Sequence, residues 1–330
     1  MRFVVLGAGA IGAYVGAALV RGGADVTLIA RGPHLRAMQE HGVQVRSPRG
    51  DFDVHPPVTE AIEAIGDADV VFLALKAHSL PALAERIGGA LGRDTAVVAA
   101  QNGIPWWYTH AAGNAPAGVR LESVDPGGRL ANAIDVSRVV GCVVYCSTEV
   151  VEPGVIRHIE GTRFAIGEPD GTRSERCRQI SEAFAAGGLR APVDADLRTQ
   201  IWLKLIGNVA FNPASALTGA TLAQLGSTAE MVAALRAVLE EGAAVAAALG
   251  VELPVSIDRR LEAGFAVGDH KTSMLQDLEA GRQLEVGCLT GAVVELAEQL
   301  GVPVPAMRVL DACTKLLDAR RVPEHVGAAA

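Results

Sequence analysis

The stretch RFVVLGAGAIGAYVGAALVRGGADVTLIA, residues 2–30, decides the fold. Its pattern predicts a short apolar strand, a helix of small residues that ends in glycines, and a second apolar strand, over residues 2–7, 9–23 and 24–30. A strand, a helix and a strand in this order indicate a βαβ unit. We therefore expect the chain to open with a Rossmann-type doubly wound α/β sheet.

The glycines between the first strand and the helix have the spacing of a dinucleotide-binding turn. In GAGAIG, Gly7 permits the tight turn, Gly9 lets the backbone approach a pyrophosphate, and Gly12 allows close packing of the helix. The amino end of the helix attracts phosphate groups. The alternative is a tight turn without a ligand. We predict that this turn binds a cofactor through Gly7, Ala8, Gly9, Ala10, Ile11 and Gly12.

The end of the second strand distinguishes between the two nicotinamide cofactors. An NAD site usually has an Asp or Glu there for the ribose hydroxyls, whereas this chain reads LIARGPHLR, with Arg31 and no acid beside it. Arg31 can form a charge-assisted contact with a 2′-phosphate. The sequence therefore favours NADP(H), and the alternative is a solvated loop arginine.

Further apolar segments extend the sheet. Strands are expected over 68–77 and 95–103, with a helix over 79–91 between them, and their near-continuous apolar character indicates parallel strands buried on both faces. Between 138 and 167 shorter runs are divided at Pro153-Gly154 and Gly161-Thr162, which predicts an antiparallel extension.

A change of pattern near residue 195 predicts a second domain. A helix over 173–188 and an extended piece over 191–196 complete the first half. Beyond it only helices are expected, over 197–211, 228–250, 255–267, 271–281, 284–300 and 305–321. We predict an NADP-binding domain over 1–195 and an all-α substrate domain over 196–330.

Composition narrows the range of partners. The 330 residues are half apolar, which is enough for two cores, and 29 basic against 37 acidic residues give a net charge of -8. A net negative charge does not favour binding to nucleic acid or to acidic lipid. No apolar span reaches about 18 residues and no signal-peptide pattern is found, so a cytoplasmic protein with a small-molecule partner is expected. The five cysteines are scattered without metal-ligand spacing, which indicates reduced, mostly buried thiols and no metal site.

A polar stripe interrupts the apolar segment IWLKLIGNVAFNP, residues 201–213. Lys204, Asn208 and Asn212 recur every four residues, so a helix places them on one face. Only four of the 29 basic residues are lysines, which suggests a need for an amine that can release its proton. Alternatively, the stripe meets solvent or the Lys204 amine extends out of a core.

Two more polar residues stand where strands are expected to end. Lys76 follows one apolar run and Asn102 follows the next. Ligands of doubly wound sheets bind beyond the carboxyl ends of the strands, so both residues are candidate contacts for ribose, nicotinamide or substrate. Each could instead simply terminate its strand.

Five motifs make the chain resemble the ketopantoate reductase family from end to end. They are GAGAIG at Gly7, LKA at Lys76, QNG at Asn102, WLKLIGNVAFNP at Lys204 and SMLQDLEAGRQLE ending at Glu285. The resemblance implies a Rossmann domain followed by a helical domain like that of 6-phosphogluconate dehydrogenase, and NADPH-dependent reduction of 2-dehydropantoate (ketopantoate) to pantoate on the route to pantothenate and coenzyme A.

The same resemblance implies roles for individual residues. Lys204 corresponds to the catalytic lysine and Glu285 to its acidic partner. Substrate contacts correspond to Asn102, Asn208, Asn212 and Ser273, and further cofactor contacts to Arg31, Lys76, Asn102 and Glu285. Chemistry agrees, because hydride arriving at a ketone carbon leaves negative charge on the oxygen, which an ammonium group stabilises and protonates.

Some positions depart from the family pattern. His270 stands where an asparagine is usual, and the segment EVGCLTG has Gly287 and Thr290 in place of an acid and an amide. Two alternatives therefore stay open: an oxidoreductase acting on another small 2-oxo or 2-hydroxy acid, and a non-catalytic NADP(H)-binding sensor. The apolar helical half could also supply the interface of a homodimer.

Overall fold

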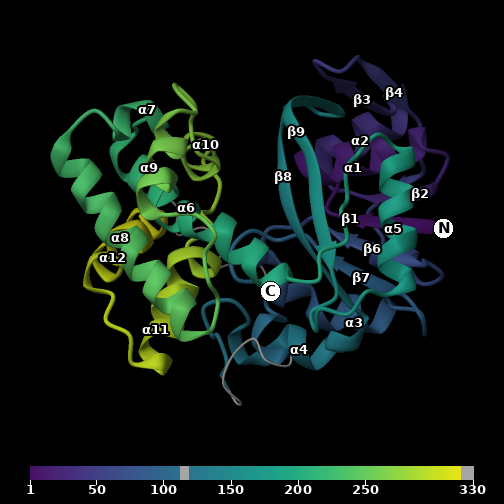
Figure 1. Cartoon of the computed structure of the whole chain (residues 1–330). Helices are drawn as coiled ribbons and strands as arrows, with labels where there is room; N and C mark the ends of the chain where they lie inside the picture. Colours follow the sequence, from purple (N-terminus) through teal and green to yellow (C-terminus); the bar gives the residue numbers. More distant parts are fainter. Residues whose placement is uncertain (112–118, 321–330) are drawn as a thin grey trace. The chain divides into compact units, whose positions relative to one another are not determined.

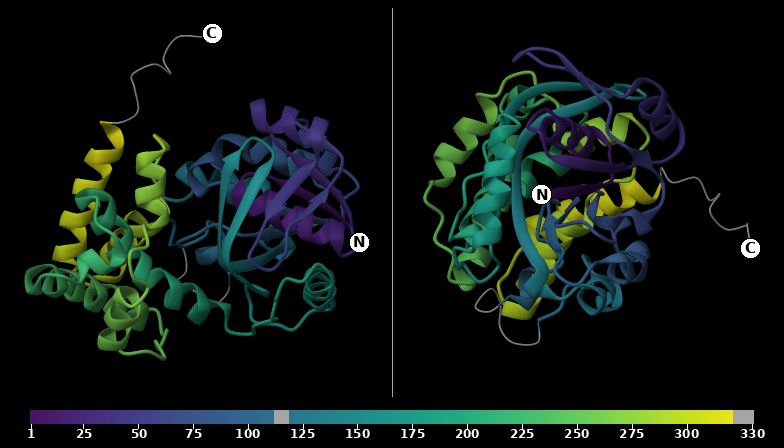
Figure 2. Two further views of the ribbon diagram at one scale, coloured as in Figure 1. Left: turned by 90° about the horizontal axis from the view of Figure 1, so that it is seen from above. Right: turned by 90° about the vertical axis from the view of Figure 1, so that its right-hand side faces the viewer.

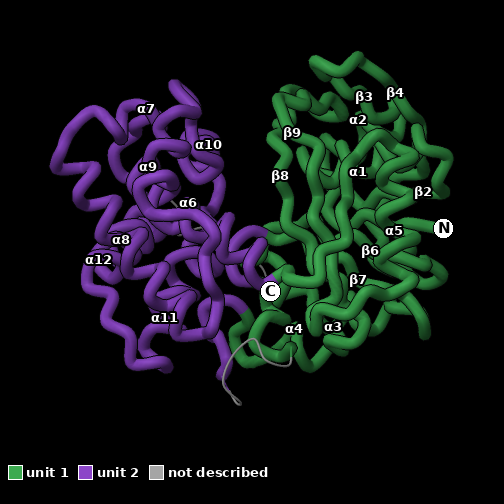
Figure 3. Tube along the Cα trace, viewed as in Figure 1, with its two compact units in different colours: residues 1–101, 105–116, 125–197 green, residues 102–104, 117–124, 198–330 purple. Residues whose placement is uncertain are grey.

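The computed structural model describes residues 1–111 and 119–320. Of these, residues 1–101, 105–111 and 125–197 form unit 1, and residues 102–104, 119–124 and 198–320 form unit 2 (Figure 3). Two short segments, 102–104 and 119–124, thus belong to the helical unit although they lie far from it in the sequence. A single division near residue 195 does not anticipate them.

Unit 1 is built on one nine-stranded sheet with the strand order β4-β3-β9-β8-β7-β6-β1-β2-β5 (Figure 1). The strands are β1 (Arg2–Leu6), β2 (Asp25–Ile29), β3 (Val43–Arg46), β4 (Phe52–Val54), β5 (Val58–Thr59), β6 (Val70–Leu73), β7 (Ala96–Ala99), β8 (Val139–Glu152) and β9 (Val155–Gly167). Strands β5, β2, β1, β6, β7 and β8 pair in parallel, and β9 pairs antiparallel to β8. The expected parallel sheet and its antiparallel extension are confirmed.

The helices of unit 1 cover this sheet. They are α1 (Ala10–Arg21), α2 (Gly32–His41), α3 (Ala84–Ala90), α4 (Arg129–Ala133) and α5 (Glu175–Ala186). Alternate strand residues pack against α1 and α5 in one hydrophobic core, where Phe184 of α5 meets Phe72 and Phe164 with ring centroids 6.0 and 5.7 Å apart. Strands β8 and β9 are the longest and run as a curved two-stranded ribbon (Figure 2).

Unit 2 is entirely helical, as expected. Its helices are α6 (Leu197–Thr218), α7 (Leu222–Leu225), α8 (Ala229–Ala248), α9 (Ile257–Phe265), α10 (Ser273–Glu279), α11 (Ala292–Leu300) and α12 (Pro305–Ala319). A π-helical turn, Gly287–Gly291, precedes α11. Helix α6 buries Trp202, Ile206 and Val209 almost completely, and Ile206 approaches Gly242 of α8 so closely that a Cβ there would lie 2.7 Å from its Cδ1.

Several element boundaries differ from the sequence prediction. The helix expected over 79–91 is two 3₁₀ turns (Ala77–Ser79 and Pro81–Leu83) followed by α3. The helix expected to end at 211 continues to Thr218 through Pro213, so Asn212 is helical. The helix expected from 284 begins with the π turn. Helices α2 and α7 and strands β3, β4 and β5 were not expected.

A buried carboxylate fixes α5 to the end of β9. Glu168 accepts a hydrogen bond from Arg176 Nε at 2.7 Å and another from the Ser174 hydroxyl. Burial alone would raise the pKa of the Glu168 carboxyl, but the hydrogen bonds from Arg176 and Ser174 outweigh it and hold the pKa below its usual 4.5. A carboxyl with a lowered pKa stabilises the fold above about pH 4.5, and this contribution is lost as the pH falls below it.

Replacing Arg176 by Met should therefore lower the free energy of unfolding at pH 7 by roughly 2 kcal/mol, because Glu168 loses its charged donor. Urea denaturation at pH 7 and at lower pH measures the effect, and the difference from the parent should shrink as Glu168 becomes protonated. Arg178→Met is the control, since Arg178 pairs with Glu175 and Glu182 at the exposed surface of the same helix. Equal destabilisation by both variants would contradict the assignment.

Candidate active site

Three of the predicted site residues lie together in unit 2. Lys204 Nζ on α6 donates to Asn102 Oδ1 at 2.6 Å, and Asn102 Nδ2 donates to Glu285 Oε2 at 3.4 Å. The second contact is long for a hydrogen bond. This pattern fixes the amide orientation, because its oxygen must face the amine and its nitrogen the carboxylate. An amine, an amide and a carboxylate thus form one half-buried cluster.

The backbone after β7 is shaped to place Asn102. Gly103 has a φ of 80°, and a Cβ there would lie only 2.1 Å from the carbonyl oxygen of Cys288. The amide of Ile104 donates to that same carbonyl at 2.8 Å. A glycine is therefore required beside Asn102, both for its conformation and for close approach to the π turn.

The polar stripe on α6 continues beyond Lys204. Asn208 is half-buried and Asn212 is only 7% exposed. Within the described residues, neither amide makes a side-chain hydrogen bond. Both residues share the helix face of Lys204 on α6, and their amides carry hydrogen-bond donors as well as acceptors.

Ser273 occupies the first position of α10 and is exposed. The residue before it, Thr272, is the N-cap and accepts a hydrogen bond from the Leu275 amide at 3.2 Å. The Ser273 hydroxyl is therefore not used for capping, and the structure records no hydrogen bond between Ser273 and the cluster. The residue that departs from the family pattern, His270, accepts a hydrogen bond from the Leu222 amide through its backbone carbonyl.

The glycine turn lies at the carboxyl end of β1 in unit 1. A Cβ on Gly12 would lie 2.2 Å from the Gly7 carbonyl oxygen, so α1 packs tightly on the turn. At Gly9, by contrast, nothing lies within 4 Å of the Cβ position. Gly9 is also the N-cap of α1, whose first turn contains no acidic residue. The turn thus presents open space and unneutralised amides at a helix amino end, which suits a phosphate group.

Three further side chains lie near this edge of the sheet. Arg31 is exposed and is the N-cap of α2. Lys76 is half-buried and follows β6 by three residues. His34, for which no role was predicted, accepts a hydrogen bond from the Gly154 amide at 2.9 Å through Nδ1. Burial lowers the pKa of His34, and the Ala8 carbonyl of the glycine turn partly offsets this.

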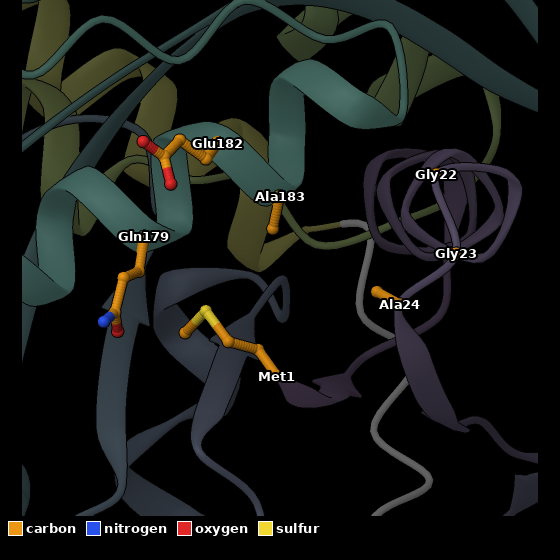
Figure 4. Close-up of a pocket in the computed structure, with 7 residues that line it drawn as sticks. All are labelled: Met1, Gly22, Gly23, Ala24, Gln179, Glu182 and Ala183. Carbon is orange, nitrogen blue, oxygen red and sulfur yellow. The ribbon is translucent and has the colours of Figure 1, made fainter.

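A separate hollow of about 280 Å³ lies at the other end of these strands (Figure 4). Its lining includes Met1 and Ala24, which precede β1 and β2, whereas the glycine turn follows β1. The hollow is therefore distant from the glycine turn and forms no part of the candidate cofactor site.

A doubly wound unit with a glycine-rich turn, followed by a helical unit that carries a lysine, an amide and a carboxylate, defines a dinucleotide-dependent oxidoreductase. Two family models match the chain: Ketopantoate reductase PanE/ApbA over residues 3–171 and Ketopantoate reductase PanE/ApbA C terminal over residues 196–318. The chain belongs to the ketopantoate reductase family. Membership implies a nicotinamide cofactor.

Individual relatives resemble the chain along its whole length. A 2-dehydropantoate 2-reductase of Mesorhizobium japonicum is 45% identical over 97% of this chain and 99% of its own. One from Halobacterium salinarum is 31% identical over 94% and 96%. A provisionally assigned ketopantoate reductase from Ralstonia solanacearum MolK2 superposes with a TM-score of 0.91 at 37% identity, covering 97% of this chain and 98% of that one. None of the helices in the described ranges is long and apolar enough to cross a membrane.

The glycine turn provides a test of packing. Gly12→Ala should lower the free energy of unfolding by about 2–3 kcal/mol or more, because the new methyl group meets the Gly7 carbonyl. Gly9→Ala should change it by less than about 0.5 kcal/mol, since its φ is −77° and the Cβ position is open. Urea denaturation compares the two variants. A stable Gly12→Ala variant would show that the helix does not pack on the turn in this way.

Proposed function

We propose that the protein reduces 2-dehydropantoate to pantoate with NADPH, in the cytoplasm, as a step toward pantothenate and coenzyme A. The observation that carries the proposal is the Lys204–Asn102–Glu285 cluster in a chain of this family, with 45% identity to a curated 2-dehydropantoate 2-reductase. The net charge of -8 gives no support to a nucleic-acid partner. We also propose that the protein forms a homodimer through its helical unit.

The proposed chemistry assigns one task to each residue of the cluster. When bound, the reduced nicotinamide supplies the hydride that attacks the C2 carbonyl carbon. The Lys204 ammonium stabilises the negative charge that develops on the carbonyl oxygen and donates a proton to it. Asn102 holds the amine in place through its side-chain oxygen, and Glu285 orients the amide through its nitrogen.

The remaining polar residues bind and orient the substrate. Asn208 and Asn212 lie one and two turns along α6 from Lys204, and their amides can donate to a carboxylate and accept from a hydroxyl. Ser273 supplies an exposed hydroxyl for the substrate carboxylate. These contacts would fix the carbonyl group relative to Lys204, which lowers the entropy cost of reaching the transition state.

The cofactor is proposed to be NADP(H) rather than NAD(H). Gly7, Gly9 and Gly12 with Ala8, Ala10 and Ile11 would hold the pyrophosphate at the amino end of α1. Arg31, exposed at the start of α2 with no acid beside it in the sequence, would pair with the 2′-phosphate. Lys76, Asn102 and Glu285 are proposed as further cofactor contacts.

Another small 2-oxo acid is the second candidate substrate. His270, Gly287 and Thr290 differ from the usual family residues, and two of them lie within the π turn that follows Glu285. Following NADPH absorbance with 2-dehydropantoate beside a panel of 2-oxo acids decides between the two substrates. A preference of orders of magnitude for another acid would contradict the first candidate and keep the reaction type.

Lys204→Ala should lower kcat by at least about 100-fold, because the carbonyl oxygen loses its proton donor. Cofactor binding, measured by fluorescence titration, should be retained. Lys271→Ala is the matched control, since Lys271 is exposed and pairs with Glu279 on α10. Turnover at the parent rate in the Lys204 variant would exclude the proton-donor role.

Arg31→Ala should weaken NADPH binding by roughly 10- to 100-fold, the usual loss of a hydrogen bond to a charged group, and leave NADH binding nearly unchanged. Titration of both cofactors against parent and variant measures the ratio. Arg36→Ala, at another exposed position of α2, should leave the ratio at the parent value. An unchanged ratio in the Arg31 variant would remove the basis for NADP(H) preference.

A further inference from the structure

A π-helical turn, GCLTG at Gly287–Gly291, follows Glu285 by one residue. A π turn places one extra residue in the helix and is less favourable than the α-helix, so it persists only where other contacts hold it. Here Cys288, Leu289, Thr290 and Gly291 are all buried. Gly287 fits because a Cβ at that position would lie 2.4 Å from the Ser123 carbonyl oxygen.

One buried hydrogen bond joins the π turn to α12. Thr290, with no exposed surface, donates from Oγ1 to Asp311 Oδ1 at 2.8 Å. The other carboxylate oxygen of Asp311 pairs with Lys315 Nζ at 2.7 Å. Asp311 is 5% exposed, so both of its oxygens must find donors to offset desolvation. Among the described residues, Thr290 and Lys315 meet this need.

The π turn in turn positions two residues of the cluster. The Cys288 carbonyl accepts the Ile104 amide at 2.8 Å and lies against Gly103, next to Asn102. The Cys288 thiol donates to the Glu285 carbonyl at 3.6 Å. The contacts that orient Asn102 and Glu285, and through Asn102 the Lys204 amine, therefore converge on one residue of the turn.

We propose that Thr290 and Asp311 are positioning residues for the Lys204–Asn102–Glu285 cluster. Without the Thr290 hydroxyl, the π turn loses its bond to α12 and the Cys288 carbonyl no longer has a fixed place. Asn102 then moves relative to α6, and the Lys204 amine loses its fixed partner. This inference rests on the proposed function, and it assigns a task to a position where the chain departs from the usual family residue.

The test is Thr290→Val, which keeps the shape of the side chain and removes the hydroxyl. Displacement of a reacting group should lower kcat by about tenfold. The dissociation constant for NADPH, measured by fluorescence titration, should rise by less than the fall in kcat, because the glycine turn, Arg31 and Lys76 belong to unit 1 and only two of the proposed cofactor contacts, Asn102 and Glu285, lie beside the π turn. Thr290→Ser, which restores the hydroxyl, should return kcat to within about threefold of the parent.

Thr314→Val is the matched control. Thr314 also has no exposed surface, lies on α12 and donates only to the Leu310 carbonyl of its own helix, at 2.7 Å. The Thr314→Val variant should keep the parent kcat, even though it also loses a buried hydroxyl. Thr290→Ala removes the same hydroxyl as the valine variant without adding a methyl group beside Asp311, and it gives the same test if the valine variant does not fold.

Thermal melting and kinetics together separate the possible outcomes. Parent kcat in a folded Thr290→Val or Thr290→Ala variant would overturn the inference, as would an equal loss of kcat in Thr314→Val. A lower melting temperature with unchanged kcat would show a purely structural role and also overturn it. If the parent protein binds NADPH but reduces no 2-oxo acid, the proposed function itself fails. That failure is seen in the parent, whereas failure of the positioning role is seen only when the variants are compared with an active parent.

Discussion

The Asn102 side chain, which links an amine to a carboxylate, is the contact on which the rest of the site depends. Its oxygen accepts from Lys204 and its nitrogen faces Glu285, so one amide relates residues that are 102 and 183 positions away in the chain. A mobile lysine side chain loses rotamer entropy when it is held in one place. The partly buried Asn102 amide offsets that cost, because the Lys204 amine gains a hydrogen bond of 2.6 Å to its oxygen.

Glycines determine where the backbone can approach other groups in both units. At Gly103 the chain passes so close to the Cys288 carbonyl that no side chain fits, and this approach sets the place of Asn102. At Gly12 the same kind of approach packs α1 against its turn, whereas Gly9 faces open space. Gly103 and Gly12 thus allow close packing within the protein, whereas the space beside Gly9 is open.

The parts of the fold that the sequence predicted are those with a local physical cause. Short apolar runs around glycines predict the opening βαβ unit. Apolar residues that recur at helical spacing, as on α6, predict the helical half. Helix α2 was not expected, although the proline in its first turn is compatible with a helix start. The strand expected to reach 103 ends at Ala99, because Gly103 and Ile104 leave the sheet to contact Cys288.

The three residues of the Lys204–Asn102–Glu285 cluster were all singled out from the sequence, but their geometry was not. Spacing placed Lys204, Asn208 and Asn212 on one helix face, and the family motifs singled out Asn102, Glu285 and Ser273. No local pattern indicates that Asn102 meets Lys204, that a π turn replaces the start of a helix, or that Thr290 binds Asp311, because these depend on contacts between distant segments. The catalytic and binding roles of these residues stay predictions.

A crystal structure of the protein with NADP⁺ and pantoate tests the central claim most directly. If Lys204 protonates the substrate oxygen, its Nζ should lie about 2.6–3.2 Å from the C2 hydroxyl oxygen, with Asn102 still in contact with the amine. A complex in which that oxygen is bound by other groups, with the Lys204 amine beyond hydrogen-bond reach, would contradict the account.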